Sequence, residues 1–149
     1  MKLEEEIKQK EFRNEYHKAL VNLIYTSNWL ESKSKDFFKK FGLTKQQFNI
    51  LRIVKGQHPN PANINLLKDR MLDKMSDASR IVERLRLKNL LDRKTCTEDK
   101  RAVDIHITKK GMDLLNKIDK EMPSFEKNFA TLSIEEAKKL NSLLDKLRG

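Results

Sequence analysis

Five polar side chains in a short stretch of the sequence have the types and spacing to form hydrogen bonds from one side of a helix: Ser76, Asp77, Ser79, Arg80 and Arg84. Hydroxyl and carboxylate groups can pair with donors and acceptors on base edges, and an arginine can hold a guanine through two hydrogen bonds. The apolar residues of the stretch recur at helical spacing and supply its buried side: Ala78, Ile81, Val82 and Leu85. We therefore expect an amphipathic helix from Ser76 to about Asn89, whose exposed side contacts double-stranded DNA.

A second set of charges lies in a polar turn between two short segments with the two-residue period of strands. Apolar and polar residues alternate over 103–107, as in a half-buried hairpin strand, and 91–95 supplies its partner. An extended arginine in such a turn can enter the minor groove, whose negative potential attracts cations. We expect Arg101 to enter this groove, with Asp99 orienting it through an ion pair and Lys100 contacting a phosphate.

Each of these assignments competes with a purely structural explanation. Arg80 and Arg84 are typical of any solvated helix face, and Lys100 and Arg101 are typical of any solvated hairpin turn. Arg93 either contacts DNA or braces the hairpin, and the sequence leaves both alternatives open. Three further cations would contact phosphate groups at most: Lys68, Arg70 and Lys74.

The helices that must position these side chains have recognisable ends. Thr44 followed by Gln47, and Ser133 followed by Glu136, form the capping-box pattern that begins a helix. Three further residues are suited to cap a helix start: Asn63, Ser76 and Thr108. The expected order is a long helix over about 4–40, helices beginning at 44, 63 and 76, the hairpin, a helix from 108 to at least 121 that Pro123 kinks or ends, and a last helix from 133.

Two short helices joined by a tight turn and followed by a hairpin with a basic tip form a winged helix-turn-helix, whose second helix lies in the DNA major groove. The N-terminal helix is expected to run without a break from about Glu4 to Lys40 and to end at Gly42. At 1.5 Å per residue, some 30 helical residues span roughly 45 Å, which exceeds the width of a small domain. Part of this helix is therefore expected to lie against another chain.

Composition agrees with this fold class and limits the alternatives. The 149 residues are enough for one domain, and 4 Gly and 3 Pro are too few for the many turns of a sandwich or barrel. The net charge of +10 suggests a polyanionic partner. Only part of that charge lies near the proposed contacts, because residues 68–101 contain 11 Lys or Arg and 7 Asp or Glu.

From Arg80 to Gly111 the sequence resembles the MarR family of bacterial transcription regulators. The shared pattern is a recognition helix, a Leu-[hydrophobic]-x-Arg strand at 90–93, an Asp-x-Arg wing at 99–101 and a Thr-x-x-Gly helix start at 108–111. Asn89 stands where the family usually has Gly, and Ile107 replaces the usual Leu. Since Asn tolerates the left-handed conformation well, we expect the turn at Asn89 to be retained.

The resemblance implies a homodimer in which helical regions 1–40 and 109–149 of two chains interlock, while 44–107 forms the winged helix-turn-helix of a single MarR-like unit over 1–149. Such a dimer would bind a pseudo-palindromic operator. In relatives, small aromatic effectors bind between the dimer region and the winged helix. Tyr25 and Trp29 are candidates to line such a cleft, but dimer or core packing is the alternative that we favour.

The sequence lacks the recognisable residue patterns of an enzyme or a metal site. It has no paired catalytic carboxylates, no Gly-rich phosphate loop and no nucleophile elbow, and its three histidines are scattered: His17, His58 and His106. Cys96 has no second cysteine to pair with, so we expect it to be inert rather than a redox sensor. We expect neither cofactor nor metal.

Taken together, these patterns predict a mainly α protein with a small β-hairpin wing. We expect a cytoplasmic, homodimeric, sequence-specific regulator of transcription that acts as a repressor, without enzymatic activity or a membrane-spanning segment. The alternative is a basic helical protein that coats nucleic acid without sequence preference.

Overall fold

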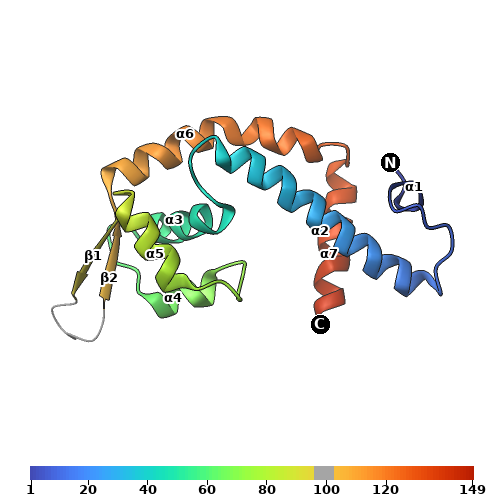
Figure 1. The fold of residues 1–149 in the computed structure, drawn as a ribbon, viewed down its shortest axis with the longest axis horizontal. Helices are drawn as coiled ribbons and strands as arrows, with labels where there is room; N and C mark the ends of the chain where they lie inside the picture. The colour runs from blue at the N-terminus through green and yellow to red at the C-terminus, as the bar shows by residue number, and fades with distance from the viewer. Residues whose placement is uncertain (96–102) are drawn as a thin grey trace.

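The computed structural model describes residues 1–95 and 103–149 (Figure 1). Its described elements are α1 (Leu3–Glu6), α2 (Glu15–Lys39), α3 (Lys45–Gln57), α4 (Ile64–Arg70), α5 (Ala78–Leu87), β1 (Leu91–Thr95), β2 (Val103–Ile107), α6 (Lys109–Glu126), the 3-10 helix η1 (Lys127–Phe129) and α7 (Ile134–Arg148). The predicted class, mainly α with one hairpin, is confirmed. Among the described helices, none combines the length and the apolar character that crossing a membrane would need.

The molecule is elongated, with the winged helix-turn-helix at one end (Figure 1). There α3, α4 and α5 pack beside the hairpin, and α6 starts next to β2 and leads away from it. The other end holds α7, α1 and the first turns of α2. The polar helix of interest, α5, is thus separated along the molecule from α1, α7 and the first turns of α2, whereas α6 connects the two ends.

The core lies where the winged helix meets α6. Large, fully buried side chains come from five different elements and pack into one cluster: Ile50, Leu51, Leu67, Leu85, Ile105, Leu115 and Ile118. The pairing of β1 with β2 is antiparallel and places Leu91 opposite Ile107, with both side chains buried. The predicted alternation in β2 is confirmed, because Ile105 and Ile107 are buried while Asp104 and His106 are only partly covered.

Most of the predicted helix starts are present as hydrogen bonds. The Thr44 hydroxyl accepts from the Gln47 N–H, and the Gln47 side chain accepts from the Thr44 N–H, each over 3.1 Å. Ser133 and Glu136 form the second capping box. Asn63 and Thr108 cap α4 and α6 as expected. These local patterns therefore place α3, α4, α6 and α7 correctly.

The expectation of one unbroken N-terminal helix is wrong. The chain leaves α1 after Glu6, passes through Lys8 with φ of +52°, and begins α2 only after Asn14, whose side chain accepts from the His17 N–H. The capping side chain of Asn14 gives the backbone a new helix start, and α1 folds back onto α2. The Tyr25 hydroxyl donates to the Glu6 carboxylate over 2.7 Å, which ties the two helices together.

One further boundary differs from expectation. The cap of α5 is Asp77 rather than Ser76, because the Asp77 carboxylate accepts from the Arg80 N–H. Ser76 lies one residue earlier and donates its hydroxyl to Asp73 instead. A residue of a suitable type therefore does not cap a helix when its side chain bonds to another partner nearby. At Pro123 the sequence left two alternatives open, and α6 continues through this residue to Glu126.

Candidate nucleic-acid interface

The exposed side of α5 carries arginines that have no partner among the described residues. Ser79, Arg80 and Arg84 are exposed, and their side chains form no hydrogen bond or ion pair within the described ranges 1–95 and 103–149. A shallow hollow of about 260 Å³ lies at the start of α5 and brings together residues from α3, α5 and the preceding turn: Thr44, Gln46, Ser76, Asp77, Arg80, Ile81 and Arg84. The donors of Arg80 and Arg84 are therefore available to an external acceptor.

A neighbouring arginine on the same helix is already occupied. Arg86 donates to both carboxylate oxygens of Glu83, from Nε over 2.9 Å and from Nη2 over 2.8 Å. This pairing, chiefly through the hydrogen bond, lowers the pKa of Glu83 below its usual value. The ion pair distinguishes Arg86 from Arg84, although the sequence shows two arginines only two positions apart. We therefore assign the contact to Arg84 and Arg80, and not to Arg86.

The turn before α5 is organised by Asp73, a residue that the sequence analysis did not single out. Its carboxylate accepts from the Ser76 hydroxyl over 2.7 Å, from the Met75 N–H over 3.1 Å and from the Gln46 amide over 3.4 Å. These hydrogen bonds, the one from Ser76 foremost, lower the pKa of Asp73. The available signal was the Asp-x-Met-Ser spacing of a side-chain-capped turn. Asp73 positions the start of α5 against α3.

The polar residues predicted at the start of α5 thus divide into two groups. Ser76 uses its hydroxyl in the turn before α5, and Asp77 uses one carboxylate oxygen to cap the helix. The side chains of Ser79, Arg80 and Arg84 form no hydrogen bond within the described part of the chain. The structure brings four of these five residues to one hollow, and Ser79 is not among its lining residues.

The hairpin is held against the body by an extra backbone pair. Ala62, in the loop after α3, donates to the Ile105 carbonyl over 2.9 Å and accepts from the Ile105 N–H over 2.8 Å. This bridge fixes the angle at which β1 and β2 leave the core. Arg93 is exposed opposite Ile105 in the register, and no described partner binds its guanidinium. The predicted wing residues Asp99, Lys100 and Arg101, together with Cys96, lie outside the described residues.

The cations around α4 have different surroundings. Lys74 donates to the backbone carbonyls of Lys68 and Asp69 at the end of α4, and so serves the helix terminus. Lys68 and Arg70 are exposed. Lys68 and Arg70 therefore stay available for the phosphate contacts that the sequence allowed, whereas the Lys74 ammonium is engaged at the end of α4.

Hydrogen bonds at Asn89 connect the end of α5 to the start of α6. Its φ of +58° is the left-handed turn that the sequence predicted, and Leu90 then donates to the Leu85 carbonyl over 3.0 Å. Thr108 donates its hydroxyl to the Asn89 carbonyl over 2.8 Å and accepts from the Gly111 N–H over 3.0 Å. A Cβ on Gly111 would lie 2.3 Å from the Leu90 carbonyl oxygen. The Thr-x-x-Gly pattern is thus a contact between α6 and the turn after α5.

The structure does not bring Tyr25 and Trp29 to a cleft between the helical region and the winged helix. Both line a hollow of about 230 Å³ under α1, with residues of α2 and the N-terminus only. The hydrogen bond to Glu6 raises the pKa of Tyr25. Trp29 packs edge-on against Phe129 at 5.6 Å between ring centres. Their positions favour packing, which was the alternative interpretation.

A different set of residues lines the cleft that does separate the two regions. This cleft has a volume of about 340 Å³, and most of its apolar wall comes from α2, α3 and α6: Phe38, Phe48, Met122 and Phe125. Sequence reasoning did not find it, because its aromatic residues are indistinguishable from ordinary core positions. Within the described ranges, no group of three or more His, Cys, Asp or Glu side chains is placed to hold a metal ion.

Comparisons with known proteins agree with this geometry. A comparison with curated proteins gave no match. Among solved structures, a MarR-like transcription regulator from Bacillus cereus ATCC 10987 superposes with a TM-score of 0.79 at 17% identity, covering 90% of this chain and 96% of that one. The MepR–DNA complex of S. aureus gives a TM-score of 0.75 at 22% identity, with 92% and 97% covered. The organohalide-sensing regulator RdhR, bound to 2,4-dichlorophenol, gives 0.79 at 20% identity, with 94% and 85% covered.

These likenesses establish the winged-helix fold of MarR-type regulators, and the sequence establishes the family. The family model described as transcriptional regulator SarA/Rot matches residues 32–118, which is more than half of the chain and runs from the end of α2 to the first half of α6. The chain therefore belongs to the SarA/Rot family of transcriptional regulators.

Proposed function

We propose that this chain is a sequence-specific DNA-binding repressor that acts as a homodimer on a pseudo-palindromic operator. The observation that carries the proposal is the pair Arg80 and Arg84, exposed on the second helix of a helix-turn-helix and without described partners. Arg86, the neighbouring arginine, is neutralised by Glu83. The solved S. aureus relative is a complex with DNA, which supports the same partner for this chain.

In this proposal α5 enters the major groove with its first turns toward the bases. Arg80 and Arg84 hold base edges, Ser79 adds a hydroxyl, and Asp77 retains one carboxylate oxygen for a base amino group. Asp99, Lys100 and Arg101 contact the minor groove and phosphates from the wing. Asp73 and Asn89 hold the two ends of the recognition helix at the angle that the groove requires.

The proposed division of the chain follows from its exposed apolar side chains. Regions 1–40 and 109–149 form the dimer and 44–107 the winged helix-turn-helix. None of the residues of α7 is buried, and large apolar side chains on α2 and α7 are exposed: Leu20, Ile24, Leu30, Leu140, Leu143 and Leu147. A second copy of the chain would cover these faces, and its two recognition helices would lie about one DNA turn, ~34 Å, apart.

Release from the operator would follow if a small apolar effector bound one spacing of the recognition helices better than another. The 340 Å³ cleft next to Phe38 and Phe125 supports such a ligand, and the RdhR relative was solved with 2,4-dichlorophenol. A compound that acts in this way must raise the Kd for the operator while leaving the dimer intact.

Selection of bound duplexes from a random pool tests the proposed function directly. We expect a pseudo-palindrome whose half-sites are separated by about one helical turn. Competition with random DNA separates the proposal from the alternative of a sequence-independent coating protein. If random duplexes compete as well as the selected sequence, the repressor proposal fails.

Replacing Arg84 with alanine is expected to weaken binding to the selected sequence by about 1–3 kcal/mol, because a two-bond contact to a base is lost. Binding to random duplex should fall much less, so that the specificity ratio collapses. The ratio of the two Kd values, measured at one salt concentration, reports this change. Arg86→Ala is the matched control, since it removes the same charge from the same helix.

Arg86→Ala is expected to raise the Kd for the selected duplex and for the random duplex by similar, small factors. Its guanidinium is held by Glu83 and is not free to hold a base. A larger loss of specificity for Arg86→Ala than for Arg84→Ala would show that the assignment of the contacting face of α5 is wrong.

A further inference from the structure

A further cleft lies on the winged-helix end of the molecule, away from the hollow at the start of α5. It has a volume of about 780 Å³ and is bordered by the turn between α2 and α3, the end of α5 and the first half of α6: Phe41, Gly42, Lys88, Leu90, Lys109, Lys110, Asp113, Leu114 and Lys117. Neither Arg80 nor Arg84 lines it. This cleft has no part in the proposed contact with DNA.

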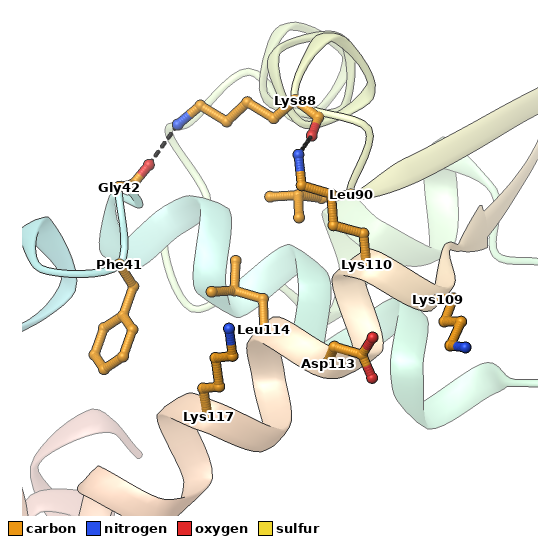
Figure 2. Close-up of a pocket in the computed structure, with 9 residues that line it drawn as sticks. All are labelled: Phe41, Gly42, Lys88, Leu90, Lys109, Lys110, Asp113, Leu114 and Lys117. Carbon is orange, nitrogen blue, oxygen red and sulfur yellow. Dashed lines mark hydrogen bonds between the residues drawn. The ribbon is translucent and has the colours of Figure 1, made fainter.

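The cleft gathers positive charge from separate elements. Figure 2 shows Lys88, Lys110 and Lys117 around the same side of α6 as Phe41 and Leu114, whereas Lys109 and Asp113 point the other way. Asp113 is the one carboxylate in the lining, and it forms no ion pair with any described lysine or arginine. Three ammonium groups therefore border one cleft, and none of them is paired with the single carboxylate of its lining.

Two of these ammonium groups are held in place by backbone carbonyls. Lys88 donates to the Gly42 carbonyl, and Lys110 donates to the Lys88 carbonyl over 2.9 Å (Figure 2). Lys88 also donates to the side-chain oxygen of Gln47 over 3.4 Å. Since an ammonium group has three N–H donors, Lys88 and Lys110 each retain at least one donor. The Lys117 side chain forms no hydrogen bond within the described part of the chain.

The charges and the walls together select the class of ligand. A lysine binds phosphate as a point charge, and a phosphomonoester carries about −1.5 to −2 at pH 7. Such a group balances three ammonium charges better than a single carboxylate does. The Phe41 ring and Leu114 are half-buried and supply apolar surface beside the cations. The volume lies within the range of about 300–1,000 Å³ that is usual for small-molecule sites.

We propose that this cleft binds a small phosphomonoester with an apolar body, the phosphate held by Lys88, Lys110 and Lys117 and the body lying against Phe41 and Leu114. The proposal goes beyond the DNA-binding function and does not depend on it. The ligand would lie where the end of α5 packs against the start of α6. This surface is different from that of the 340 Å³ cleft between Phe38 and Phe125.

Calorimetric titration of the full chain with phenyl phosphate, without DNA, tests the proposal. We expect one site per chain and an affinity at least tenfold higher than that for inorganic phosphate, with no binding of benzyl alcohol. Equal affinity for inorganic phosphate would show an adventitious ion only, and the absence of phenyl phosphate binding would overturn the proposal.

Variants of Lys117 locate the site. Lys117→Met should lower the affinity for phenyl phosphate at least tenfold, whereas Lys117→Arg, which keeps the charge, should retain most of it. Lys120→Met is the control, since it removes an equal charge from α6 outside the cleft lining. Unchanged binding by Lys117→Met, or displacement of phenyl phosphate by duplex DNA, would place the phosphate elsewhere and overturn the assignment.

Discussion

Replacing Gly111 with alanine is expected to lower the free energy of unfolding by about 2–3 kcal/mol, the upper part of the range for overpacking a tight contact. The new Cβ would lie 2.3 Å from the Leu90 carbonyl oxygen and 2.9 Å from Cγ1 of Ile107. The first of these atoms belongs to the backbone, so the clash cannot be relieved by rotating a side chain. Chemical denaturation, followed by circular dichroism at a fixed protein concentration, measures the change.

The cost is large because the carbonyl that would have to move is itself engaged. Leu90 accepts from the Thr108 N–H over 3.2 Å, and the Thr108 hydroxyl donates to Asn89. A shift of Leu90 therefore disturbs both bonds between the end of α5 and the start of α6. We expect the same substitution to weaken operator binding, because it changes the orientation of the recognition helix.

Gly56→Ala is the matched control and is expected to change stability in the opposite direction. Gly56 lies inside α3, and a Cβ built there meets no atom within 4 Å. Alanine in a helix is favoured over glycine by roughly 0.5–1 kcal/mol. If Gly111→Ala is as stable as the unmodified protein, the close contact between α6 and the turn after α5 does not exist in solution.

Replacing Leu143 with glutamate is expected to raise the dimer dissociation constant by more than about a hundredfold. In the proposed dimer, two-fold symmetry places the substitution on both sides of the interface, and an unpaired buried carboxylate costs about 3–5 kcal/mol. In the isolated chain Leu143 is 55% exposed, and a substitution at such a position usually changes stability by less than about 0.5 kcal/mol. A large effect on assembly with a small effect on folding is thus the signature of a second copy.

Sedimentation equilibrium over a range of concentrations separates these outcomes. Ser142→Glu introduces the same charge outside the apolar face of α7, since at 100° of rotation per residue Ser142 lies about 100° from Leu143 and about 160° from Leu140, and it should leave the dimer intact. Operator affinity should fall with Leu143→Glu, because two half-sites are no longer held together. A wild-type chain that sediments as a monomer at micromolar concentration would contradict the homodimer itself.

Much of the fold was predictable because its determinants are local. The capping boxes at Thr44 and Ser133, the left-handed turn at Asn89 and the alternation in β2 each depend on residues within a few positions of one another. Hydrogen bonds across so short a separation form where the residue types permit them and no competing partner lies nearby. The order of the elements, and with it the winged helix-turn-helix, follows from those local signals.

The incorrect predictions concern residues whose hydrogen-bond partner the local pattern does not specify. Ser76 was expected to cap α5, but Asp73 accepts its hydroxyl proton and Asp77 takes the cap. The N-terminal helix was expected to be continuous, but Asn14 begins α2 while Glu6 reaches back to Tyr25. In each case a competing hydrogen bond decided between two conformations that the sequence alone allowed.

By itself, the sequence determined most of the elements, the polar face of the recognition helix and the family to which the chain is similar. The pairing of Glu83 with Arg86, three residues apart on α5, is also a local contact, and it leaves Arg84 without a described partner. Tertiary structure decided which residues from distant parts of the chain meet. Packing brought Lys88, Lys110 and Lys117 to one cleft and pressed Gly111 against Leu90. The physical reason is that charge balance and close contact depend on distances between elements, which hydrophobic packing sets and no short stretch of residues records.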